Sequence, residues 1–451
     1  MRGLEGYCAL NERVRGLVAR SRYGPCSTSI PMTTSANQSP RRFLQSGHLP
    51  TLIAALLYFD VSFMAWVVLG PLAPFIRDSY ALSPTEQGFL ISLPLLGGSL
   101  FRPILGALAD RIGGRRTGIF GLVLTLLPLV AGWTVAQTTA HLYAVGFLLG
   151  IAGASFAVAL PLASRWYPPE HQGLAMGIAG AGNSGTLLAT LLAPRLAERF
   201  GWAATLGLVA LPVLAVLVCF ALMARDSPRR APAPAWRDYT AVLGEPDTLW
   251  FSLLYGLTFG GFVGLTSFLP TYFNDEFHVS RIAAGDFTTM VVVSGSLLRP
   301  VGGWLADRIG GYRLLLMLLG AVSVCLSALP GLPSLAAVIP LLFVALGLLG
   351  MGNGAVFQLV PQRFGDRMGL VTGIVGAAGG LGGFFLPLLL GIVRDWTGSY
   401  AAGLLLCASC YAAGALLLLE LGTRWTNDWG PHMVRHSGVF CYRGWWRAAV
   451  D

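Results

Sequence analysis

Long apolar stretches alternate with short polar ones along almost the whole chain. A helix needs about 18 or more apolar residues to cross the roughly 30 Å hydrocarbon core of a bilayer, and twelve runs reach that length. Their approximate bounds are 49–76, 86–109, 117–136, 140–165, 172–199, 201–224, 247–274, 281–306, 312–330, 334–361, 367–394 and 399–421. The pattern predicts an all-α membrane protein with twelve transmembrane helices.

A Pro-rich charged segment, RDSPRRAPAPAWRDYTAVLGEPD, separates the sixth predicted helix from the seventh. We therefore expect two six-helix halves, over 49–224 and 247–421, joined by a cytoplasmic linker over 225–246. Residues 1–48 are polar and lack the apolar core of a signal peptide, which predicts a disordered cytoplasmic extension. Residues 422–451 form a polar cytoplasmic tail in this division.

The two halves repeat each other. Residues 99–116 read SLFRPILGALADRIGGRR and residues 296–313 read SLLRPVGGWLADRIGGYR, with identical residues at 13 of the 18 positions. GLAMGIAGA at 173–181 likewise matches GLVTGIVGA at 369–377. Two halves of the same orientation predict a parallel repeat about an axis along the membrane normal, with the substrate site between them near the midplane.

Composition narrows the function classes. Charged residues are 11% of the chain, less than half of the roughly 25% in soluble domains, and hydrophobic residues are 55%. The net charge of +9 comes from arginines in short loops between apolar runs, which predicts a cytoplasmic side with both termini on it and argues against nucleic-acid binding. Seven scattered cysteines form no disulfide framework. No nucleophile, metal-ligand or nucleotide motif is present, so we expect no enzyme, metal or cofactor.

Two arginines interrupt the apolar runs. Arg102 and Arg299 each precede an interfacial aspartate, Asp110 or Asp307, by eight residues, which places them about 12 Å inside the membrane boundary. An arginine at a helix centre costs about 2.5–3.5 kcal/mol on insertion scales, so such residues normally face a polar cavity. Only Asp60 stands at comparable depth, which leaves at least one positive charge unpaired. Guanidinium binds oxyanions through bidentate hydrogen bonds, so the pair predicts an anion site. A buried ion pair with Asp60 is the structural alternative.

Candidate neighbours of the arginines lie at similar depth. Tyr255 and Phe259 are an i, i+4 pair on one helix face, Phe156 lies in the fourth predicted helix and Asn183 in the fifth. Each alone is also compatible with ordinary core packing. Together they offer flat walls, one amide and one phenol, which suits a small planar anion better than a bulky tetrahedral one.

The loops after the second and eighth predicted helices resemble a signature of the major facilitator superfamily. GALADRIGGRR, with Gly106, Asp110 and Arg111, matches the superfamily's G-x-x-x-D-R-x-G loop, and GGWLADRIGGYR repeats it in weaker form with Asp307 and Arg308. Because these residues lie at the membrane surface, we expect them to make gating contacts at helix ends.

Over residues 50–421 the chain resembles the nitrate/nitrite porter family of that superfamily, of prokaryotic type. The resemblance rests on the paired arginines, on FDVSFMAWVVLGPLAP and GMGNGAVFQLVP, and on the runs GIAGAGNSG and GIVGAAGGLGG. It implies nitrate or nitrite held between Arg102 and Arg299, hydrogen-bonded by Asn183 and Tyr255 and packed against Phe156 and Phe259. The glycine signature comprises Gly177, Gly180, Gly182, Gly373, Gly376, Gly379 and Gly380.

The expected function is secondary active transport of nitrate or nitrite across the cytoplasmic membrane, by a monomer surrounded by lipid. Family members are proton symporters or nitrate/nitrite antiporters; FDVSFM is more similar to the symporters, and Asp60 is the candidate for proton coupling. Two alternatives remain at this point. An organophosphate/phosphate antiporter would be favoured by additional Lys or His near the site, and a non-transporting anion sensor by an appended signalling domain.

Overall fold

The computed structural model describes residues 43–439 except 44, 229–234, 333, 365–367 and 430. Most of the predicted extension over 1–48, the linker arginines Arg229 and Arg230, the loop residue Arg367 and the last part of the tail lie outside the described residues. Within the described ranges the regular elements are all helices.

Every predicted span coincides with a helical segment. In the N-terminal half these are α3 (Leu49–Val67), α4 (Leu69–Tyr80), α5 (Pro84–Ile112), α6 (Gly114–Thr134), α7 (Thr139–Gly153), α8 (Phe156–Ser164), α9 (Pro169–Gly180), the 3₁₀ turn η1 (Ala181–Ser184), α10 (Gly185–Phe200) and α11 (Trp202–Met223). The linker contains α12 (Trp236–Leu243). The C-terminal half has α13 (Pro246–Tyr255), the π-helical turn η2 (Gly256–Gly260), α14 (Gly261–Phe277), α15 (Arg281–Ile309), α16 (Gly311–Ala328), η3 (Leu329–Gly331), α17 (Leu335–Phe364), α18 (Met368–Thr397) and α19 (Ala401–Asp428), followed by α20 (Pro431–Ser437).

Ten of these segments in the described part of the chain are long and apolar enough to cross a membrane. The fifth and eighth predicted spans correspond to α9–η1–α10 and to α15, which is 29 residues long. The architecture is therefore that of an all-α, multi-pass membrane protein, and it is consistent with twelve spans.

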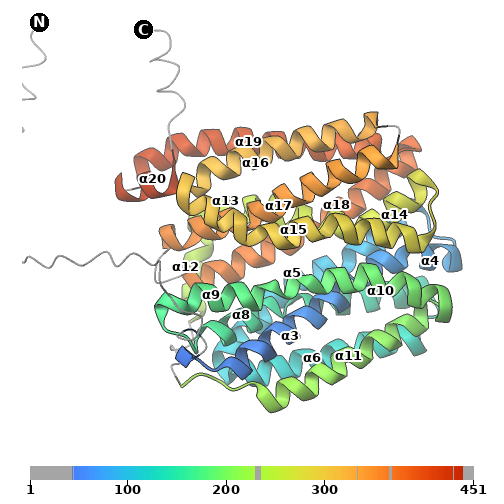
Figure 1. The fold of residues 1–451 in the computed structure, drawn as a ribbon, viewed down its shortest axis with the longest axis horizontal. Helices are drawn as coiled ribbons and strands as arrows, with labels where there is room; N and C mark the ends of the chain where they lie inside the picture. The colour runs from blue at the N-terminus through green and yellow to red at the C-terminus, as the bar shows by residue number, and fades with distance from the viewer. Residues whose placement is uncertain are drawn as a thin grey trace, which may run out of the picture. The chain divides into compact units, whose positions relative to one another are not determined.

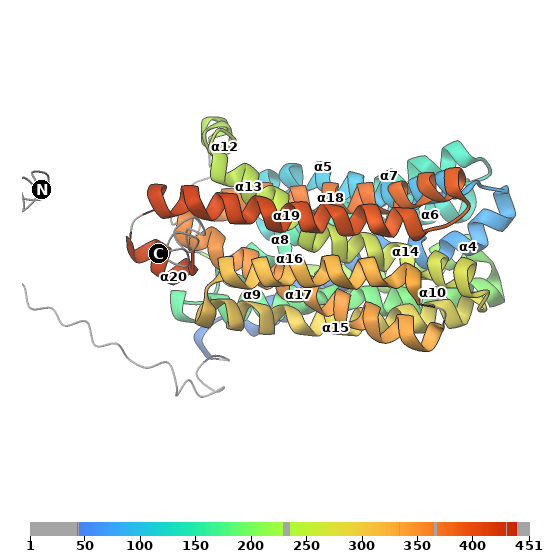
Figure 2. The same cartoon turned by 90° about the horizontal axis from the view of Figure 1, so that it is seen from above.

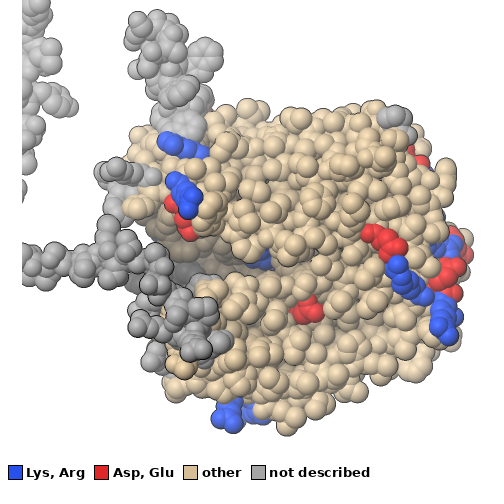
Figure 3. Space-filling view, viewed as in Figure 1, with Lys and Arg blue, Asp and Glu red and all other residues tan. Residues whose placement is uncertain are grey.

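The two halves lie side by side, with α3–α11 in blue to green and α13–α19 in yellow to red (Figure 1). Viewed from above, the long helices of both halves run in roughly the same direction (Figure 2). Contacts between the halves are made by α5 with α18, α10 with α15, and α4 with α14. In Figure 3 charged side chains gather mainly at the two ends of the bundle, and a broad, mostly uncharged surface lies between them. Such a surface is suited to hydrocarbon.

We call the two ends of the bundle the linker end and the far end. The linker end carries the α5–α6 and α15–α16 connections, and the far end carries the α4–α5 and α14–α15 connections. The repeated sequence phrase has the same local structure in both halves: α5 and α15 each end at a glycine with positive φ, Gly113 (99°) and Gly310 (90°). Glycine adopts this conformation without the steric cost that a Cβ would impose. These equivalent ends set Arg102 and Arg299 at equivalent positions along their helices.

The C-terminal region is more structured than a polar tail. α19 continues to Asp428, beyond the predicted end near residue 421, because its last turns pack on the C-terminal half. Asp247, at the start of α13, accepts hydrogen bonds from the indoles of Trp425 (2.8 Å) and Trp429 (3.2 Å), and pairs with Arg363 at the end of α17. These contacts tie the end of α19 to the linker end of its own half.

Candidate functional site

A cavity of about 250 Å³ extends from the middle of the bundle to the linker end. Arg102 and Phe156 line its deep part, and Asp110, Arg165 and Tyr239 of the linker helix line the part near the linker end. Residues of both halves contribute, since α18 supplies Leu370, Thr372, Gly373 and Ile374. The two halves thus enclose a space that is accessible from one end.

Five of the six predicted binding residues come together around Arg102 and Phe156, which line the inner end of this cavity. The ring of Phe156 lies near both arginines, with centroid distances of 5.6 Å to the guanidinium carbon of Arg102 and 5.9 Å to that of Arg299. Phe259 also lies against Arg102, at 5.3 Å. Tyr255 stacks on Phe259 with ring planes 4° apart and lies within hydrogen-bonding reach of the Arg299 guanidinium. The structure thus brings together five residues from α5, α8, α13, η2 and α15; their role in binding stays a prediction.

The charge of this cluster is not balanced by a carboxylate. Arg102 is 2% exposed and donates from Nε to the backbone oxygen of Gly153 (3.0 Å) and from Nη1 to that of Gly376 in the opposite half. Arg299 has a buried Nη1 with no hydrogen-bond partner. Within the described residues neither arginine forms an ion pair, and the two guanidiniums are close enough to repel each other electrostatically. A buried donor without a partner is costly, so an anion at this position would satisfy both the charge and the donor.

Two aromatic residues of the cluster were not predicted. Phe357 on α17 lies 6.0 Å from the guanidinium of Arg299 and 4.8 Å from the ring of Tyr255. Trp66 on α3 lies 5.1 Å from the guanidinium of Arg102, and its indole donates to the backbone oxygen of Pro94 at 2.6 Å. The sequence contains one indication of Phe357. Phe357 lies four residues before Pro361, and in the other half Phe156 lies at a similar place, five residues before Pro161.

Asn183 and Asp60 lie on neighbouring elements rather than against the guanidiniums. Asn183 is buried on η1, and its Oδ1 has no hydrogen-bond partner. Asp60 on α3 accepts a hydrogen bond from Ser184 of η1 (2.6 Å), and Gly185, the first residue of α10, packs against its backbone. The alternative in which Asp60 is the ion-pair partner of Arg102 or Arg299 is wrong for this conformation, because η1 supplies the hydrogen-bond partner of its carboxylate.

The predicted gating residues lie at the linker end. Asp110 forms an ion pair with Arg165, which directly follows α8, at 2.6 Å within the N-terminal half, and Gly106 lines the cavity one helical turn deeper. Arg111 is exposed. In the second copy Asp307 is exposed, and Arg308 lies over the ring of Trp304 at 3.9 Å. The two copies of the motif therefore share backbone geometry but differ in their side-chain contacts.

The glycine signature divides by environment. A Cβ at Gly177, Gly180 or Gly373 would meet nothing within 4 Å, so close packing does not explain these three. A Cβ at Gly379 would lie 2.7 Å from the ring of Tyr255 and 2.9 Å from that of Phe259. Gly379 thus leaves room for the stacked pair that faces the arginines, and Gly376 supplies the backbone oxygen that Arg102 binds. Gly182 and Gly380 allow close approach to α3 and α5 respectively.

Polar contacts between the halves close the far end, and we call them the far-end seal. Asp275 pairs with Arg77 (2.5 Å) and accepts from the hydroxyl of Tyr400 (2.7 Å). Other contacts of the seal are Arg195 with Asp286 (2.6 Å), Arg281 with Asp78, and the backbone amide of Thr85 with Asp395 (2.8 Å). Backbones also approach closely, since a Cβ on Gly88 would lie 2.4 Å from the oxygen of Pro387. This conformation is sealed at the far end and hollow toward the linker end.

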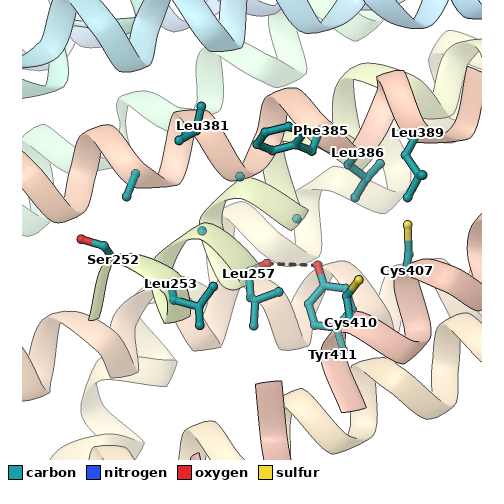
Figure 4. A pocket seen from close by; sticks show the side chains of 14 residues that line it. Ser252, Leu253, Leu257, Leu381, Phe385, Leu386, Leu389, Cys407, Cys410 and Tyr411 are labelled. Carbon is teal, nitrogen blue, oxygen red and sulfur yellow. Dashed lines mark hydrogen bonds between the residues drawn. The ribbon is translucent and has the colours of Figure 1, made fainter. Parts of the chain in front are cut away.

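A second hollow, of about 450 Å³, lies between η2, α18 and α19. Its lining is apolar, with Leu253, Leu257, Phe385 and Leu389 around Cys407 and Cys410 (Figure 4). The Tyr411 hydroxyl donates to the backbone oxygen of Leu257 in the π-helical turn at 3.0 Å. Since no charged side chain lines it, this groove does not suit an anion. Among the described residues no group of His, Cys, Asp or Glu is arranged to hold a metal ion.

An all-helical bundle of two repeated halves around a central cavity with access from one end defines a membrane transporter. Residues 54–387 match the family model described as Major Facilitator Superfamily. The chain belongs to this superfamily and, within it, to the nitrate/nitrite porter family.

Three relatives support the assignment to the nitrate/nitrite porter family. The probable nitrate/nitrite transporter NarK2 of Mycobacterium tuberculosis is 36% identical over 80% of this chain and 93% of its own. The nitrite extrusion protein of Bacillus subtilis is 34% identical over 83% of this chain and 94% of its own. The probable nitrate/nitrite antiporter NarK1 of Thermus thermophilus is 33% identical over 78% and 86% respectively.

A solved structure agrees with the fold. A bacterial homologue of the human lysosomal transporter Spinster, in an inward-facing and occupied conformation, superposes with a TM-score of 0.68. The match covers 88% of this chain and 100% of that chain at 18% identity. The family match and the three relatives make the chain a transporter and not an enzyme, as the sequence predicted.

Phe357 provides a test of the cluster. Replacing Phe357 with Ala removes an aromatic wall from Arg299 and Tyr255, and an aromatic contact of this kind is worth about 0.5–1.5 kcal/mol. We expect the affinity for nitrate, used as test anion, to fall by up to about tenfold, measured as KM for uptake into proteoliposomes. The matched control is Phe343→Ala, a partly exposed residue of the same helix, which should leave KM unchanged. An unchanged KM in Phe357→Ala would exclude Phe357 from the site.

Proposed function

We propose that this protein carries nitrate, nitrite or both across the cytoplasmic membrane by alternating access. The observation that carries the proposal is the pair of guanidiniums at the inner end of the cavity, which have no carboxylate partner among the described residues and are walled by flat aromatic rings. The names of the relatives support the identity of the anion.

The chemistry of the cluster suits a small planar anion. Both arginines can direct N–H groups at one oxyanion, and such charge-assisted bonds are about twice as strong as neutral ones. Tyr255 can donate through its hydroxyl and Asn183 through its amide nitrogen after a small movement of η1. Phe156, whose ring lies near both guanidiniums, offers a flat wall that favours a planar ligand over a tetrahedral phosphate ester. We therefore rank the organophosphate/phosphate antiporter below the nitrate carrier.

Arg102 also links the two halves. It belongs to α5, and it donates to the backbone oxygen of Gly376 on α18. An anion that binds both Arg102 and Arg299 competes for this donor and replaces the backbone contact by a shared ligand. Binding would in this way change the contact between the halves, which is what a transported substrate has to do in order to shift a two-state equilibrium.

The arginine-rich linker end faces the cytoplasm in this proposal, with both termini on that side, as the distribution of arginines favours. The present conformation is then open inward and sealed outward. Transport requires the far-end seal to open while Asp110, Arg165 and the residues around them approach the opposite half. We favour proton symport, with Asp60 as the coupling residue; nitrate/nitrite exchange is the alternative.

The arginine pair gives the first test of this function. Arg102→Lys and Arg299→Lys should each abolish uptake of labelled nitrate into proteoliposomes, because an ammonium keeps the charge but loses the planar fork. The control, Arg199→Lys, changes an exposed far-end arginine and should leave uptake intact. Uptake near the wild-type rate in either cavity variant, with insertion verified, would refute the proposed site.

The far-end seal gives the second test. Thr271 is 1% exposed and bonded to Gln87 of the other half at 3.1 Å, so a Thr271→Cys variant without the native cysteines should react slowly with a membrane-impermeant thiol reagent added from the far side. Adding Asp275→Asn weakens the ion pair with Arg77, which joins the halves, and the hydrogen bond from Tyr400 that helps to hold Asp275 in place. A loss of about 1 kcal/mol should raise the open population and the labelling rate about fivefold.

Asp428→Asn, at an exposed position of the linker end, serves as the control for the loss of a negative charge and should not change the labelling rate. Equal labelling rates with and without Asp275→Asn would mean that these contacts do not hold the far end closed.

A further inference from the structure

Asp60 is held by η1 through both its side chain and its backbone. Its carboxylate accepts from the Ser184 hydroxyl at 2.6 Å. A Cβ on Gly185, the first residue of α10, would lie 1.9 Å from the backbone oxygen of Asp60, and one on Gly182 would lie 2.8 Å from its backbone nitrogen. Only glycine at these two positions lets η1 and the start of α10 approach α3 closely enough for the hydrogen bond to form and for the Gly185 amide to lie beside the carboxylate.

Among the residues that the structure describes, no positively charged side chain forms an ion pair with this carboxylate. The elements packed on α3 are α4 to α11 and η1, and α15 packs on η1 and α10. Nearest to Asp60 among the cations are Arg102 and Arg299, which make the contacts described above. Tyr58 and Cys219 lie on α3 and α11. The remaining described charged or titratable side chains of these elements lie toward the helix ends: Arg77, Asp78, Tyr80, Glu86, Asp110, Arg111, Arg115, Arg116, His141, Tyr143, His171, Arg195, Glu198, Arg199, Arg281, Asp286, Asp307 and Arg308. The side chain of Glu170 lies outside the described set.

The same elements reach the anion cluster by two short routes. Ser184 directly follows Asn183, the predicted amide ligand, on η1. Phe59 directly precedes Asp60 on α3, and its ring lies 5.8 Å from that of Phe156, which lies near both guanidiniums. A half-buried carboxylate inside a membrane helix is costly to retain and commonly serves an ion or proton pathway.

We propose that Asp60, the Ser184 hydroxyl and the Gly185 amide form the proton-binding site of this transporter, and that η1 connects it to the anion site. The proposal rests on the proposed function and adds the route of coupling. The ionised carboxylate accepts the hydrogen bond from Ser184 and attracts the Gly185 amide, and in this way it holds η1 against α3. Protonation removes the charge and occupies one acceptor position, which loosens η1 and frees Asn183 to turn toward the anion.

The sign of the coupling follows from electrostatics. An anion in the cavity repels an ionised Asp60 across a medium of low dielectric constant, and it does not repel a protonated one. Anion binding therefore favours protonation, and by linkage protonation favours anion binding by the same factor. The affinity for nitrate is then highest at low pH and falls as the pH rises through the titration of Asp60.

Two variants separate the roles of the groups. Asp60→Asn has no titratable group and should make the affinity independent of pH. Ser184→Ala removes a donor that stabilises the ionised carboxylate, so the carboxylate should take up its proton at higher pH and the midpoint of the profile should move upward. The control is Ser323→Ala in the C-terminal half, which removes a hydroxyl that donates to the backbone oxygen of Ala408 in the same half and should reproduce the wild-type profile.

The experiment is calorimetric titration of nitrate into the purified full-length protein over a series of pH values. Allosteric couplings of ordinary size predict a wild-type affinity about fivefold or more higher at the acid end than at the alkaline end. A pH-independent wild type that binds nitrate would overturn the proposal, as would a wild-type profile in Asp60→Asn or an unmoved midpoint in Ser184→Ala. A wild type that binds no nitrate at any pH would instead contradict the proposed function.

Discussion

Two positive charges inside an apolar bundle, with Arg102 buried and Arg299 half-buried, are the constraint on which the rest of this structure depends, because no carboxylate among the described residues balances them. Arg102 and Arg299 occupy equivalent places in two repeated helices, and neither forms an ion pair among the described residues. Charges at this depth are tolerated where they face a cavity and bind something. The structure provides such a cavity beside Arg102. It also provides aromatic walls, and Gly379 leaves room for the rings of Tyr255 and Phe259.

The same constraint explains why binding and conformational change are connected. One arginine comes from each half, so an anion bound to both connects the two halves that move. The N–H group that Arg102 now donates to the backbone oxygen of Gly376 becomes available to this anion. The far-end seal holds the opposite end closed with contacts that likewise join the halves, such as Arg77 with Asp275. Asp60 lies near the anion site and is bonded to Ser184 of η1. In the proposed coupling, protonation of Asp60 therefore affects the anion site although Asp60 is not paired with an arginine.

How far the sequence predicted this arrangement depends on how each feature is encoded. Helix positions follow from runs of apolar residues, and all twelve predicted spans coincide with helical segments. A charge within an apolar run is conspicuous, which is why Arg102 and Arg299 were identified. An aromatic residue in such a run resembles any core residue, so Phe357 and Trp66 were missed. The partner of Asp60 depends on the 3₁₀ turn at 181–184, a departure from the α-helix that local sequence patterns do not specify.

A structure of the protein determined with nitrate bound is the most direct test of the anion site at Arg102 and Arg299. We expect density for one planar anion between the guanidiniums of Arg102 and Arg299, packed against Phe156, with Nη1 of Arg299 donating to it and the contact between Arg102 and Gly376 lengthened or lost. Nitrate bound elsewhere in the cavity, with both arginines in the contacts they make now, would contradict the central claim that the unpaired charges form the transport site.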